Sequence, residues 1–548
     1  MNPALAHLDL AVIAGYLLLI VGLGCWAGLR KRPAGTAESQ EYFLAGRSLG
    51  WFMIGVSLFA TNISCYHLIG LAQNGFDTGL LNGNFEWMAS FTLILLALFF
   101  VPFYFRSGIS TLPDFLERRF NHRCRDWLAV LSVVASIIIH ITFSFVAGGV
   151  VLESLFGLDR YTCILVIAVI TGVYTVLGGL RAVVWTESIQ TVVLLVGAFA
   201  VTAACWIKAG GWAPVAAEIA RAGEPERLSM LRPHGDPSGM PWYAILLGYP
   251  VLGIWYWCAD QTIVQRVLGA KDENHARTGP LFAGLIKILP VFIFVVPGLF
   301  AWYLSRTGGF DISSLPVVDG KTDTKGVYTL MITQLLPHGL IGLVIAALLA
   351  GLMSNVAAAL NSVSTLVSLD LYKRLRPQAT DHQLVLVGRI AAALALVIGI
   401  ATVWPASQYS SIFNGINDVI AHIAPPVTCV FLFGVFWGRA SGFAAQWTLW
   451  LGSALGVLVF ALNKLVPTNP LHDIPFMMMA WWLFVACSTI MTALSLAVPH
   501  QHTEVSRDLY WKSPLDPLRA PGWPGLADYR VLAGGLLVLM IVLYGIFR

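Results

Sequence analysis

The chain has 548 residues, of which 57% are hydrophobic and only 11% are charged. Soluble domains carry about 25% charged residues, so this composition excludes a soluble globular protein and is typical of a chain that crosses a membrane many times. The net charge of +4 at pH 7 is small, and we expect no nucleic acid as a partner.

About fourteen apolar segments are each long enough to cross a bilayer as a helix of roughly 20 residues. In chain order they lie near residues 8–29, 50–75, 80–105, 126–155, 160–178, 183–206, 241–265, 278–305, 337–371, 384–403, 409–436, 442–463, 474–498 and 529–547. The first segment is followed by Arg30, Lys31 and Arg32, the reverse of the charge order in a cleaved signal peptide. We therefore interpret it as a retained membrane span.

Lysine and arginine residues gather in every second loop between these segments. The basic clusters at 30–32, 118–125 and 373–376 fall on one side of the membrane if the N-terminus lies on the other. Because cytoplasmic loops carry the excess of basic residues, we predict a multi-pass protein of the cell membrane (plasma or inner membrane) with both termini outside. The longer loops, about 207–240 and 306–336, are then external.

Two of the spans are interrupted by polar residues. The second contains a polar run from Ala60 to His67, and the seventh contains Asp260, Gln261 and Gln265 just after a Trp-Tyr-Trp cluster. Each polar group costs free energy in hydrocarbon unless it faces protein, water or an ion. Two interrupted spans that stand five spans apart predict an inverted-repeat transporter, with its substrate and ion sites near the membrane midplane where the helices unwind.

This pattern divides the chain into three parts. Residues 1–45 are predicted to hold a peripheral first helix and a cytoplasmic loop. The transport core is predicted within 46–440 and is built from two repeats, at about 50–206 and 241–436. Residues 441–548 supply three further peripheral helices.

Isolated polar residues inside apolar spans are candidates for the substrate site. Lys287 has no neighbouring route to water and needs a carboxylate or hydroxyl partner, either in a binding site or in a structural ion pair. Glu86, near the start of the third span, is either an interfacial anchor or a carboxylate that accepts hydrogen bonds from a polyol. Asn62 and His67 add amide and imidazole groups, although polar side chains of this kind can also bond to their own helix backbone.

A cation site is predicted where the second and ninth spans cross. Gly351 and Ser354 share one face of the ninth span, so a backbone carbonyl and a side-chain oxygen lie together there. Hard cations take oxygen ligands, and unwound backbone at Ala60 and Ile63 would complete a Na⁺ shell. The alternative is that Ser354 is only a helix-packing contact.

Three further polar residues lie close to the predicted site. Asn417 and Asp418 are in the eleventh span. Asn417 is expected to face the site, and Asp418 is interpreted either as a relay or gate residue or as the partner of an arginine. Glu187 is near the cytoplasmic start of the sixth span. It is interpreted either as an exit-path residue or as the partner of a loop arginine such as Arg119.

At these residues the chain resembles the solute:sodium symporter family, and within it the sodium/glucose (galactose) cotransporter branch. The matching stretches lie at 46–50 (GRSLG), 57–63 (SLFATNI), 83–87 (GNFEW), 174–180 (YTVLGGL), 255–261 (WYWCADQ), 263–266 (IVQR), 361–365 (NSVST) and 424–426 (APP), together with Lys287. The resemblance implies an all-α, LeuT-type 5+5 inverted repeat with about 14 transmembrane helices that works by alternating access.

The resemblance also implies roles for single residues. The residues similar to the family's substrate contacts are Asn62, His67, Glu86, Tyr256, Trp257, Lys287 and Asn417, with Tyr256 as the inner gate whose ring stacks on the sugar. The residues similar to its sodium site are Ala60, Ile63, Gly351, Ser354 and Asn355. The residues expected at the gate and along the exit path are Tyr256, Asp260, Gln261 and Glu187.

The sequence departs from this branch at several positions. Asn355 stands where a second serine completes the sodium site, and Gly253 stands where a polar side chain contacts the sugar. The hydroxyl pair and aspartate of a second ion site are replaced by Ala357, Ala358 and Glu187. We therefore predict a single coupling Na⁺.

The combined prediction is Na⁺-coupled symport of a monosaccharide, a glucose- or galactose-like hexose, into the cell. Its partners are the sugar, Na⁺ and the lipid bilayer, and ATP is not expected because the sequence has no P-loop. One alternative is a Na⁺ symporter of another polyol or small solute, such as an inositol or an amino sugar. Another is a sugar sensor or sugar-gated ion conductor on the same scaffold. An enzyme is not expected, because no catalytic dyad with metal ligands is seen.

Overall fold

The computed structural model describes residues 5–29, 37–318, 320–407, 412–466, 468–513 and 515–548. Regular structure in these ranges is helical apart from one antiparallel pair of two-residue strands, β1 (Val317–Val318) and β2 (Lys321–Thr322). The protein is therefore an all-α membrane protein, as predicted. The basic cluster Arg30, Lys31 and Arg32 lies outside the described residues.

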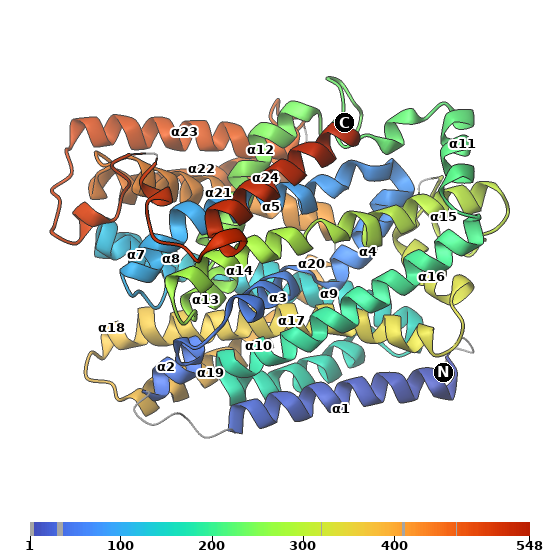
Figure 1. The fold of residues 1–548 in the computed structure, drawn as a ribbon, viewed down its shortest axis with the longest axis horizontal. Coiled ribbons are helices and arrows are strands. Elements are labelled where there is room, and N and C mark those ends of the chain that lie inside the picture. Colours follow the sequence, from blue (N-terminus) through green and yellow to red (C-terminus); the bar gives the residue numbers. More distant parts are fainter. Residues whose placement is uncertain (1–4, 30–36, 319, 408–411, 467, 514) are drawn as a thin grey trace.

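The α-helices follow one another along the chain in Figure 1. Their bounds are α1 His7–Leu29, α2 Glu38–Leu44, α3 Trp51–Asn62, α4 Cys65–Thr78, α5 Asn84–Leu95, α6 Val101–Arg106, α7 Leu112–Arg119, α8 His122–Ala135, α9 Phe143–Phe156, α10 Arg160–Ala209, α11 Trp212–Ala222, α12 Trp242–Ile254, α13 Gln261–Leu268, α14 Glu273–Ile286, α15 Val296–Arg306, α16 Val327–Leu335, α17 Leu340–Thr365, α18 Lys373–Leu375, α19 Asp381–Ala401, α20 Val403–Ala406, α21 Ile412–Phe436, α22 Gly442–Leu465, α23 Phe476–Ala497 and α24 Tyr529–Ile546.

Within the described residues, five π-helical segments occur at helix junctions. Their bounds are Leu96–Phe100, Ser136–Thr142, Trp255–Ala259, Val291–Val295 and Leu366–Tyr372. Such segments are frequent at functional sites because they shift side chains out of the regular helical register.

Twelve continuous helical stretches of the described chain are long and apolar enough to cross a membrane. The predicted number was about fourteen. The difference arises where two predicted spans run together. One case is the stretch Cys65–Arg106, in which a short 3-10 helix over Gly79–Gly83 joins α4 to the third span. The other is α10, whose 50 residues would extend about 75 Å and so cover two spans.

The long helix α10 bends at Gly179, where φ is 59° and ψ is −157°. This left-handed backbone favours glycine, and a Cβ at the same place would lie 2.4 Å from the carbonyl oxygen of Tyr42. Gly179 therefore marks the boundary between the predicted fifth and sixth spans.

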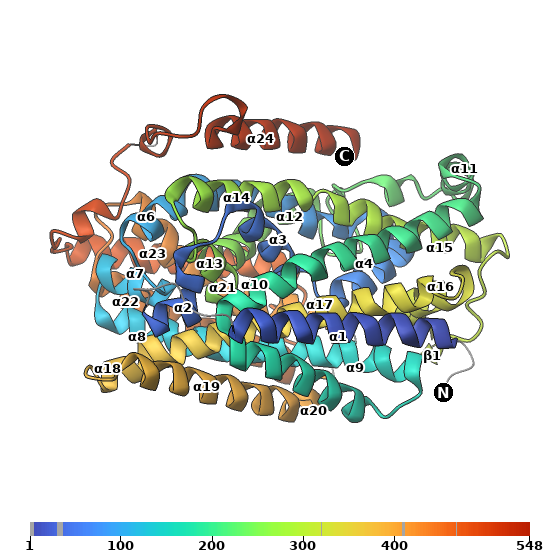
Figure 2. The same cartoon turned by 60° about the horizontal axis from the view of Figure 1, so that its bottom comes forward.

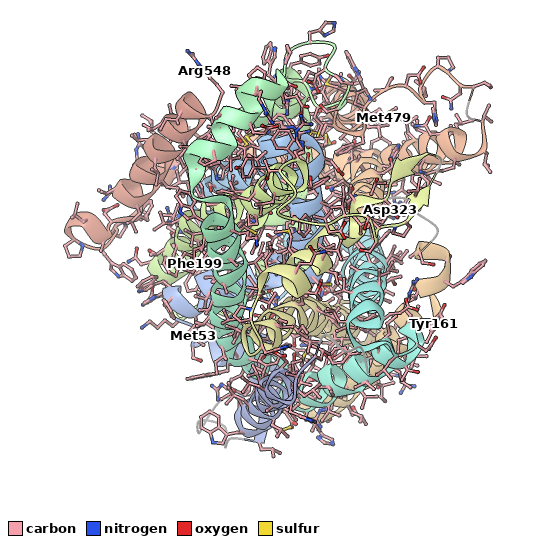
Figure 3. The ribbon with its side chains drawn as sticks, turned by 90° about the vertical axis from the view of Figure 1, so that its right-hand side faces the viewer. Met53, Tyr161, Phe199, Asp323, Met479 and Arg548 are labelled. Atoms are coloured by element: carbon pink, nitrogen blue, oxygen red, sulfur yellow. The ribbon has the colours of Figure 1, made fainter. Side chains whose placement is uncertain are left out.

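Helix α17 lies at the centre of the bundle, where nearly all of its residues are buried. Helix α10 packs along α17, and α1 packs against both of them, while α3 packs on α14 and α4 packs on α15. Helix α24 packs on α14 and α5 at the outer edge of the molecule. Figure 2 shows it along the edge of the bundle, and Figure 3 labels Arg548 at its end.

The two ends of the bundle carry different elements. Helices α11 and α16 lie near the end where α1 begins, and α24 runs toward this same end. Helices α2, α7 and α18 lie at the other end (Figures 1 and 2).

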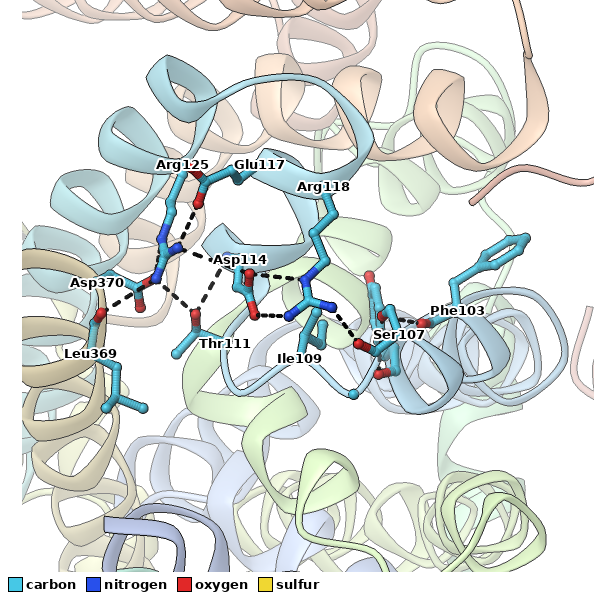
Figure 4. A network of polar contacts seen from close by, with 12 residues as sticks. Phe103, Ser107, Ile109, Thr111, Asp114, Glu117, Arg118, Arg125, Leu369 and Asp370 are labelled. Carbon is cyan, nitrogen blue, oxygen red and sulfur yellow. Dashed lines mark hydrogen bonds and ion pairs between the residues drawn. The ribbon is translucent and has the colours of Figure 1, made fainter. Parts of the chain in front are cut away.

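An ion-pair network lies at the end that carries α7 (Figure 4). The buried carboxylate of Asp370, just after α17, accepts hydrogen bonds from Arg125 Nε at 2.8 Å and Thr111 Oγ1 at 2.9 Å. Arg125 also pairs with Glu117 of α7. Because removing one partner of a buried ion pair is strongly destabilising, this network fixes α7 and α8 against the end of α17.

The segment between α23 and α24 docks against the end of α21. The buried guanidinium group of Arg119 donates to the carbonyl oxygens of Gly434 and Trp437, and His502 Nε2 lies 2.8 Å from the carbonyl oxygen of Gly438. The backbone N–H of Gly442 donates to His500 Nδ1 at 3.2 Å. Burial, followed by the charge of Arg119, lowers the pKa of His500 to about 4.

We expect the docking of residues 499–513 to depend on pH through His500. The docked state keeps this imidazole neutral down to a pKa of about 4, whereas an exposed histidine protonates near pH 6.5. Docking is therefore full above about pH 6.5 and weakens as the pH falls toward 4. Hydrogen exchange of residues 499–513, corrected for the intrinsic rate at each pH, measures this change. The variant His500→Phe should lose most of the pH dependence, and an unchanged dependence in that variant would assign it to another group.

Candidate functional site

The predicted interruption of the second span is present as a break between two helices. Helix α3 ends at Asn62 and α4 begins at Cys65, while Ile63 and Ser64 between them have extended backbone. The side chains of Ser64 and His67 form a reciprocal capping box that satisfies N–H groups at the start of α4. The break therefore leaves backbone carbonyls near Ala60 and Ile63 outside the regular helical pattern.

The second break lies at Asp260. Helix α12 continues through the π-helical segment Trp255–Ala259 and stops at Asp260, which has extended backbone. Asp260 Oδ1 then accepts a hydrogen bond from the N–H of Thr262 at 2.8 Å and so caps α13. This hydrogen bond offsets part of the free energy that it costs to bury an aspartate side chain inside an apolar span.

A small cavity, partly open to solvent, lies between α4, α5, α12 and α21. Six of the seven predicted substrate residues line it: Asn62, His67, Glu86, Tyr256, Trp257 and Asn417. The lining residues that the sequence did not indicate as contacts are Tyr66, Phe85, Tyr249, Leu252, Ile416 and Ile420.

Lys287 lies behind this wall and is not among the lining residues. Its ammonium group donates to Asn62 Oδ1 at 2.5 Å and to the carboxylate of Glu86, and the Lys287 and Glu86 side chains are each 1% exposed. It also lies 5.6 Å from the ring centroid of Trp257. The carboxylate partner that was predicted for the buried ammonium is therefore Glu86, which lines the cavity. Lys287 fixes Glu86 and Asn62 from the side that faces away from the cavity.

Asn62 connects this ammonium group to Tyr256. Its Oδ1 accepts from Lys287, and its Nδ2 donates to the hydroxyl of Tyr256 at 3.2 Å. His67 Nε2 lies 4.0 Å from Glu86 Oε1 on the same wall. The cavity thus presents a carboxylate, an imidazole, an amide and a phenol beside an aromatic surface, a set that can pair with many hydroxyl groups at once.

The predicted sodium-site oxygens come together at the crossing of α3 and α17. The hydroxyl of Ser354 lies 2.9 Å from the carbonyl oxygen of Ala60 and 3.1 Å from that of Gly351. A Cβ added at Gly351 would lie 3.3 Å from the carbonyl oxygen of Ile63, so this oxygen faces the same place.

Asn355 adds a further oxygen to this region. Its Nδ2 donates to the carbonyl oxygen of Thr61 at 3.1 Å, whereas its buried Oδ1 has no hydrogen-bond partner among the described residues. A buried oxygen without a donor is suited to a cation. The residues present therefore fit Na⁺: they offer carbonyl, hydroxyl and amide oxygens and no competing ammonium group.

A second buried ion pair, between Glu187 and Arg266, lies next to these sodium-site residues. The carboxylate of Glu187 accepts from Arg266 Nη2 at 2.9 Å, from Thr61 Oγ1 at 2.9 Å and from the hydroxyl of Ser57. Its suggested pairing with Arg119 is wrong, because Arg119 caps the end of α21 instead. Arg266 reaches Glu187 because α13, which carries Arg266, and α10, which carries Glu187, both pack against α3.

The remaining predicted polar residues lie farther from the cavity. Gln261 Oε1 accepts from the N–H of Leu112 at 2.9 Å, which places it against α7. Asp418 Oδ2 lies 3.1 Å from Lys464 Nζ of α22, so its cationic partner is a lysine and not an arginine.

One residue of the site was missed in the sequence. His140, a lone histidine in the run Ile-Ile-Ile-His-Ile, is 1% exposed, and its Nε2 lies 2.7 Å from Asp260 Oδ2. Gly253, where the sequence departs from the family, lines the cavity, and a Cβ there would lie 2.7 Å from Tyr249 Cε1 and 2.9 Å from Thr92 Cγ2. The ring of Tyr249 therefore occupies the space beside Gly253.

Comparisons with known proteins agree with this geometry. The family model described as "Sodium:solute symporter family" matches residues 42–452. The chain is 35% identical over 505 residues to "Sodium/glucose cotransporter 2" of Rattus norvegicus, covering 85% of this chain and 72% of the relative. It is 34% identical over 568 residues to "Sodium/mannose cotransporter SLC5A10" of Bos taurus, covering 96% and 93%.

The solved structures similar to this chain show its fold. A Na⁺-coupled sialic acid symporter in a substrate-bound, outward-open state has a TM-score of 0.77 at 21% identity, covering 91% of this chain and 100% of that one. The nucleobase-cation-symport-1 transporter Mhp1 in a closed conformation has a TM-score of 0.51 at 16% identity, covering 87% and 98%. These likenesses establish the LeuT-type inverted-repeat fold that the sequence predicted.

We expect the contributions of Lys287 and Glu86 to the free energy of unfolding to be coupled, so that removing one of the two charges costs more than removing both. Lys287→Met leaves a buried carboxylate without its cation and should lower the free energy of unfolding by about 3–5 kcal/mol. The double variant Lys287→Met/Glu86→Gln removes both charges and should recover most of this loss. Thermal unfolding in detergent, followed for both variants and for each single change, measures the coupling; strictly additive losses would contradict it.

Proposed function

Because this chain belongs to the sodium:solute symporter family, we propose that it carries a monosaccharide, a glucose- or galactose-like hexose, into the cell together with Na⁺. The relatives named as sodium/glucose and sodium/mannose cotransporters support a sugar as the substrate. The observation that carries the proposal is the polar and aromatic wall of the cavity, held by the buried ammonium of Lys287.

The chemistry of this wall suits a neutral polyol. We assign substrate contacts to Asn62, His67, Glu86, Tyr256, Trp257 and Asn417, with Lys287 holding Asn62 and Glu86 in place. The carboxylate of Glu86 accepts hydrogen bonds from hydroxyl groups and repels an anionic solute. Flat aromatic side chains such as Tyr256 and Trp257 offer apolar faces on which a sugar ring can stack.

The ion site is assigned to Ala60, Ile63, Gly351, Ser354 and Asn355. It uses the break between α3 and α4 on one side and α17 on the other. Bound Na⁺ would hold the break in the form that presents Asn62 and His67 to the cavity, so that sugar binds better when Na⁺ is present. This ordering is the source of coupling.

The inner boundary of the cavity is assigned to Tyr256, whose hydroxyl is held by Asn62. Movement of this residue, together with rocking of the repeats, exposes the site to the inside, where Asp260 and Gln261 line the way out. Glu187, which was also expected on this path, is instead engaged by Arg266. One positive charge that crosses about 100 mV contributes roughly 2.3 kcal/mol. This supports a sugar gradient of about 50-fold, before the Na⁺ gradient is added.

We infer one Na⁺ per sugar. Ala357 and Ala358 supply no hydroxyl groups for a second ion. The Glu187 carboxylate is already engaged by Arg266, Ser57 and Thr61, which supports a structural use of that carboxylate.

We assign both termini to the outside of the cell membrane. The end of the bundle with α2, α7 and α18 carries the basic residues of 118–125 and 373–376, which suits the cytoplasm. Helix α1 begins at the opposite end, and α24 runs toward it.

Transport into liposomes tests the proposed function. Purified protein with Na⁺ outside and K⁺ inside should accumulate a labelled hexose above its outside concentration, and a panel that includes inositols and amino sugars identifies the solute. Equal uptake after Na⁺ is replaced by K⁺ at fixed pH would contradict sodium coupling. Dissipation of a sugar gradient without accumulation would identify a conductor or sensor.

Replacement of the Ser354 hydroxyl tests the ion site. Ser354→Ala removes one predicted Na⁺ ligand and should raise the Na⁺ concentration for half-maximal uptake by about tenfold, the size expected for one lost interaction of about 1.4 kcal/mol. The relative preference among sugars should stay the same, because Ser354 does not line the cavity. The control Ser362→Ala changes a buried serine of the same helix and should leave the Na⁺ dependence unaltered. A changed sugar preference with normal Na⁺ dependence would mean that the ion binds elsewhere.

A further inference from the structure

His140 is a buried titratable residue to which the proposed function gives no part. It lies in the π-helical segment Ser136–Thr142 between α8 and α9, and it is 1% exposed. Its Nε2 lies 2.7 Å from Asp260 Oδ2, while its Nδ1 has no hydrogen-bond partner among the described residues. A histidine at this depth, bonded to a carboxylate at a helix break, invites a functional explanation.

The bond holds the chain where the seventh span is broken. Asp260 uses Oδ1 to cap α13, which leaves Oδ2 for His140. A second contact runs in parallel, because Ser136 Oγ lies 3.0 Å from Thr262 Oγ1. The start of α13 is therefore tied at two points to the segment that carries His140.

The same histidine contacts the proposed gate. The ring centroids of His140 and Tyr256 are 5.8 Å apart, with an angle of 45° between the rings. Tyr256 is thus held at its hydroxyl by Asn62 and beside its ring by His140. We call residues Trp255–Ala259 the gate segment. His140 contacts this segment at Tyr256 and bonds to Asp260, the residue that directly follows it.

We propose that His140 is a positioning residue for the gate: its bond to Asp260 holds the gate segment closed beneath the substrate cavity and breaks when the site opens inward. The inference rests on the proposed function only in calling Tyr256 the gate. When His140 cannot bond to Asp260, the gate segment opens without substrate, and Na⁺ and sugar movement lose their coupling.

A native cysteine reports on the gate segment without any transport assay. Cys258 is fully buried within this segment, with its Sγ 3.7 Å from the carbonyl oxygen of Thr92. Cys205, fully buried in α10, serves as a control away from the gate. The rate at which N-ethylmaleimide alkylates each cysteine, measured by peptide mass spectrometry on the full chain with Na⁺ present, gives the opening of each region.

The comparison uses an apolar and a hydrogen-bonding replacement of similar size. His140→Leu should speed alkylation of Cys258 by about tenfold or more, as expected for loss of a hydrogen bond to a charged group, and should leave Cys205 unchanged. His140→Gln can still donate to Asp260 and should bring the Cys258 rate back to within about threefold of the parent. If His140→Leu does not fold, Asp260→Asn replaces it, since this change keeps the size of the side chain and weakens the same bond.

Several outcomes would overturn the proposal. An unchanged Cys258 rate would mean that the bond does not hold the gate segment. An equal rise at Cys205 would assign the effect to general loosening, and failure of glutamine to restore the rate would assign it to the shape of the imidazole. In liposomes, His140→Leu should lower the sugar accumulation ratio about fivefold or more with the sugar KM unchanged. A protein that carries no hexose would fail the parent uptake assay and still give the Cys258 result.

Discussion

The proposed site depends on the contacts that the buried ammonium group of Lys287 makes with Glu86 and Asn62. A cation inside the membrane is stable only with partners, and here Glu86 and Asn62 supply them. Because Glu86 belongs to α5, Asn62 to the end of α3 and Lys287 to the end of α14, one charge fixes three helices at the cavity. Through Asn62 the same charge also sets the position of Tyr256, so the polar wall and the proposed gate share one support.

Much of this arrangement was predictable, since polar residues in apolar spans cost free energy and therefore mark places where something binds them. The breaks at 60–67 and near Asp260 are present, and six of the seven predicted substrate residues share one cavity. The all-α inverted-repeat fold follows from the same pattern. Helix ends were less certain, since apolar residues continue through the bend at Gly179 and through the stretch 65–106.

Other features depend on packing between distant segments and have no signature in the sequence. Arg266 and not Arg119 pairs with Glu187, and Lys287 stands behind the cavity wall, because these relations follow from how α13 and α14 pack on α3. The absence of a side chain at Gly253 is explained only by the fold, in which the ring of Tyr249 occupies the space beside it. His140 is one polar residue in an apolar run of the sequence, and only the fold places Asp260 against it.

Thr61 links two sites that are otherwise separate. Its carbonyl oxygen accepts from Asn355 next to the proposed sodium ligands, and its hydroxyl donates to Glu187 in the ion pair with Arg266. Coupling between the proposed sodium site and the Glu187–Arg266 pair would pass through this residue, and thermodynamic linkage makes any such coupling equal in both directions. By whatever factor the intact pair strengthens sodium binding at the proposed site, bound sodium would strengthen the pair.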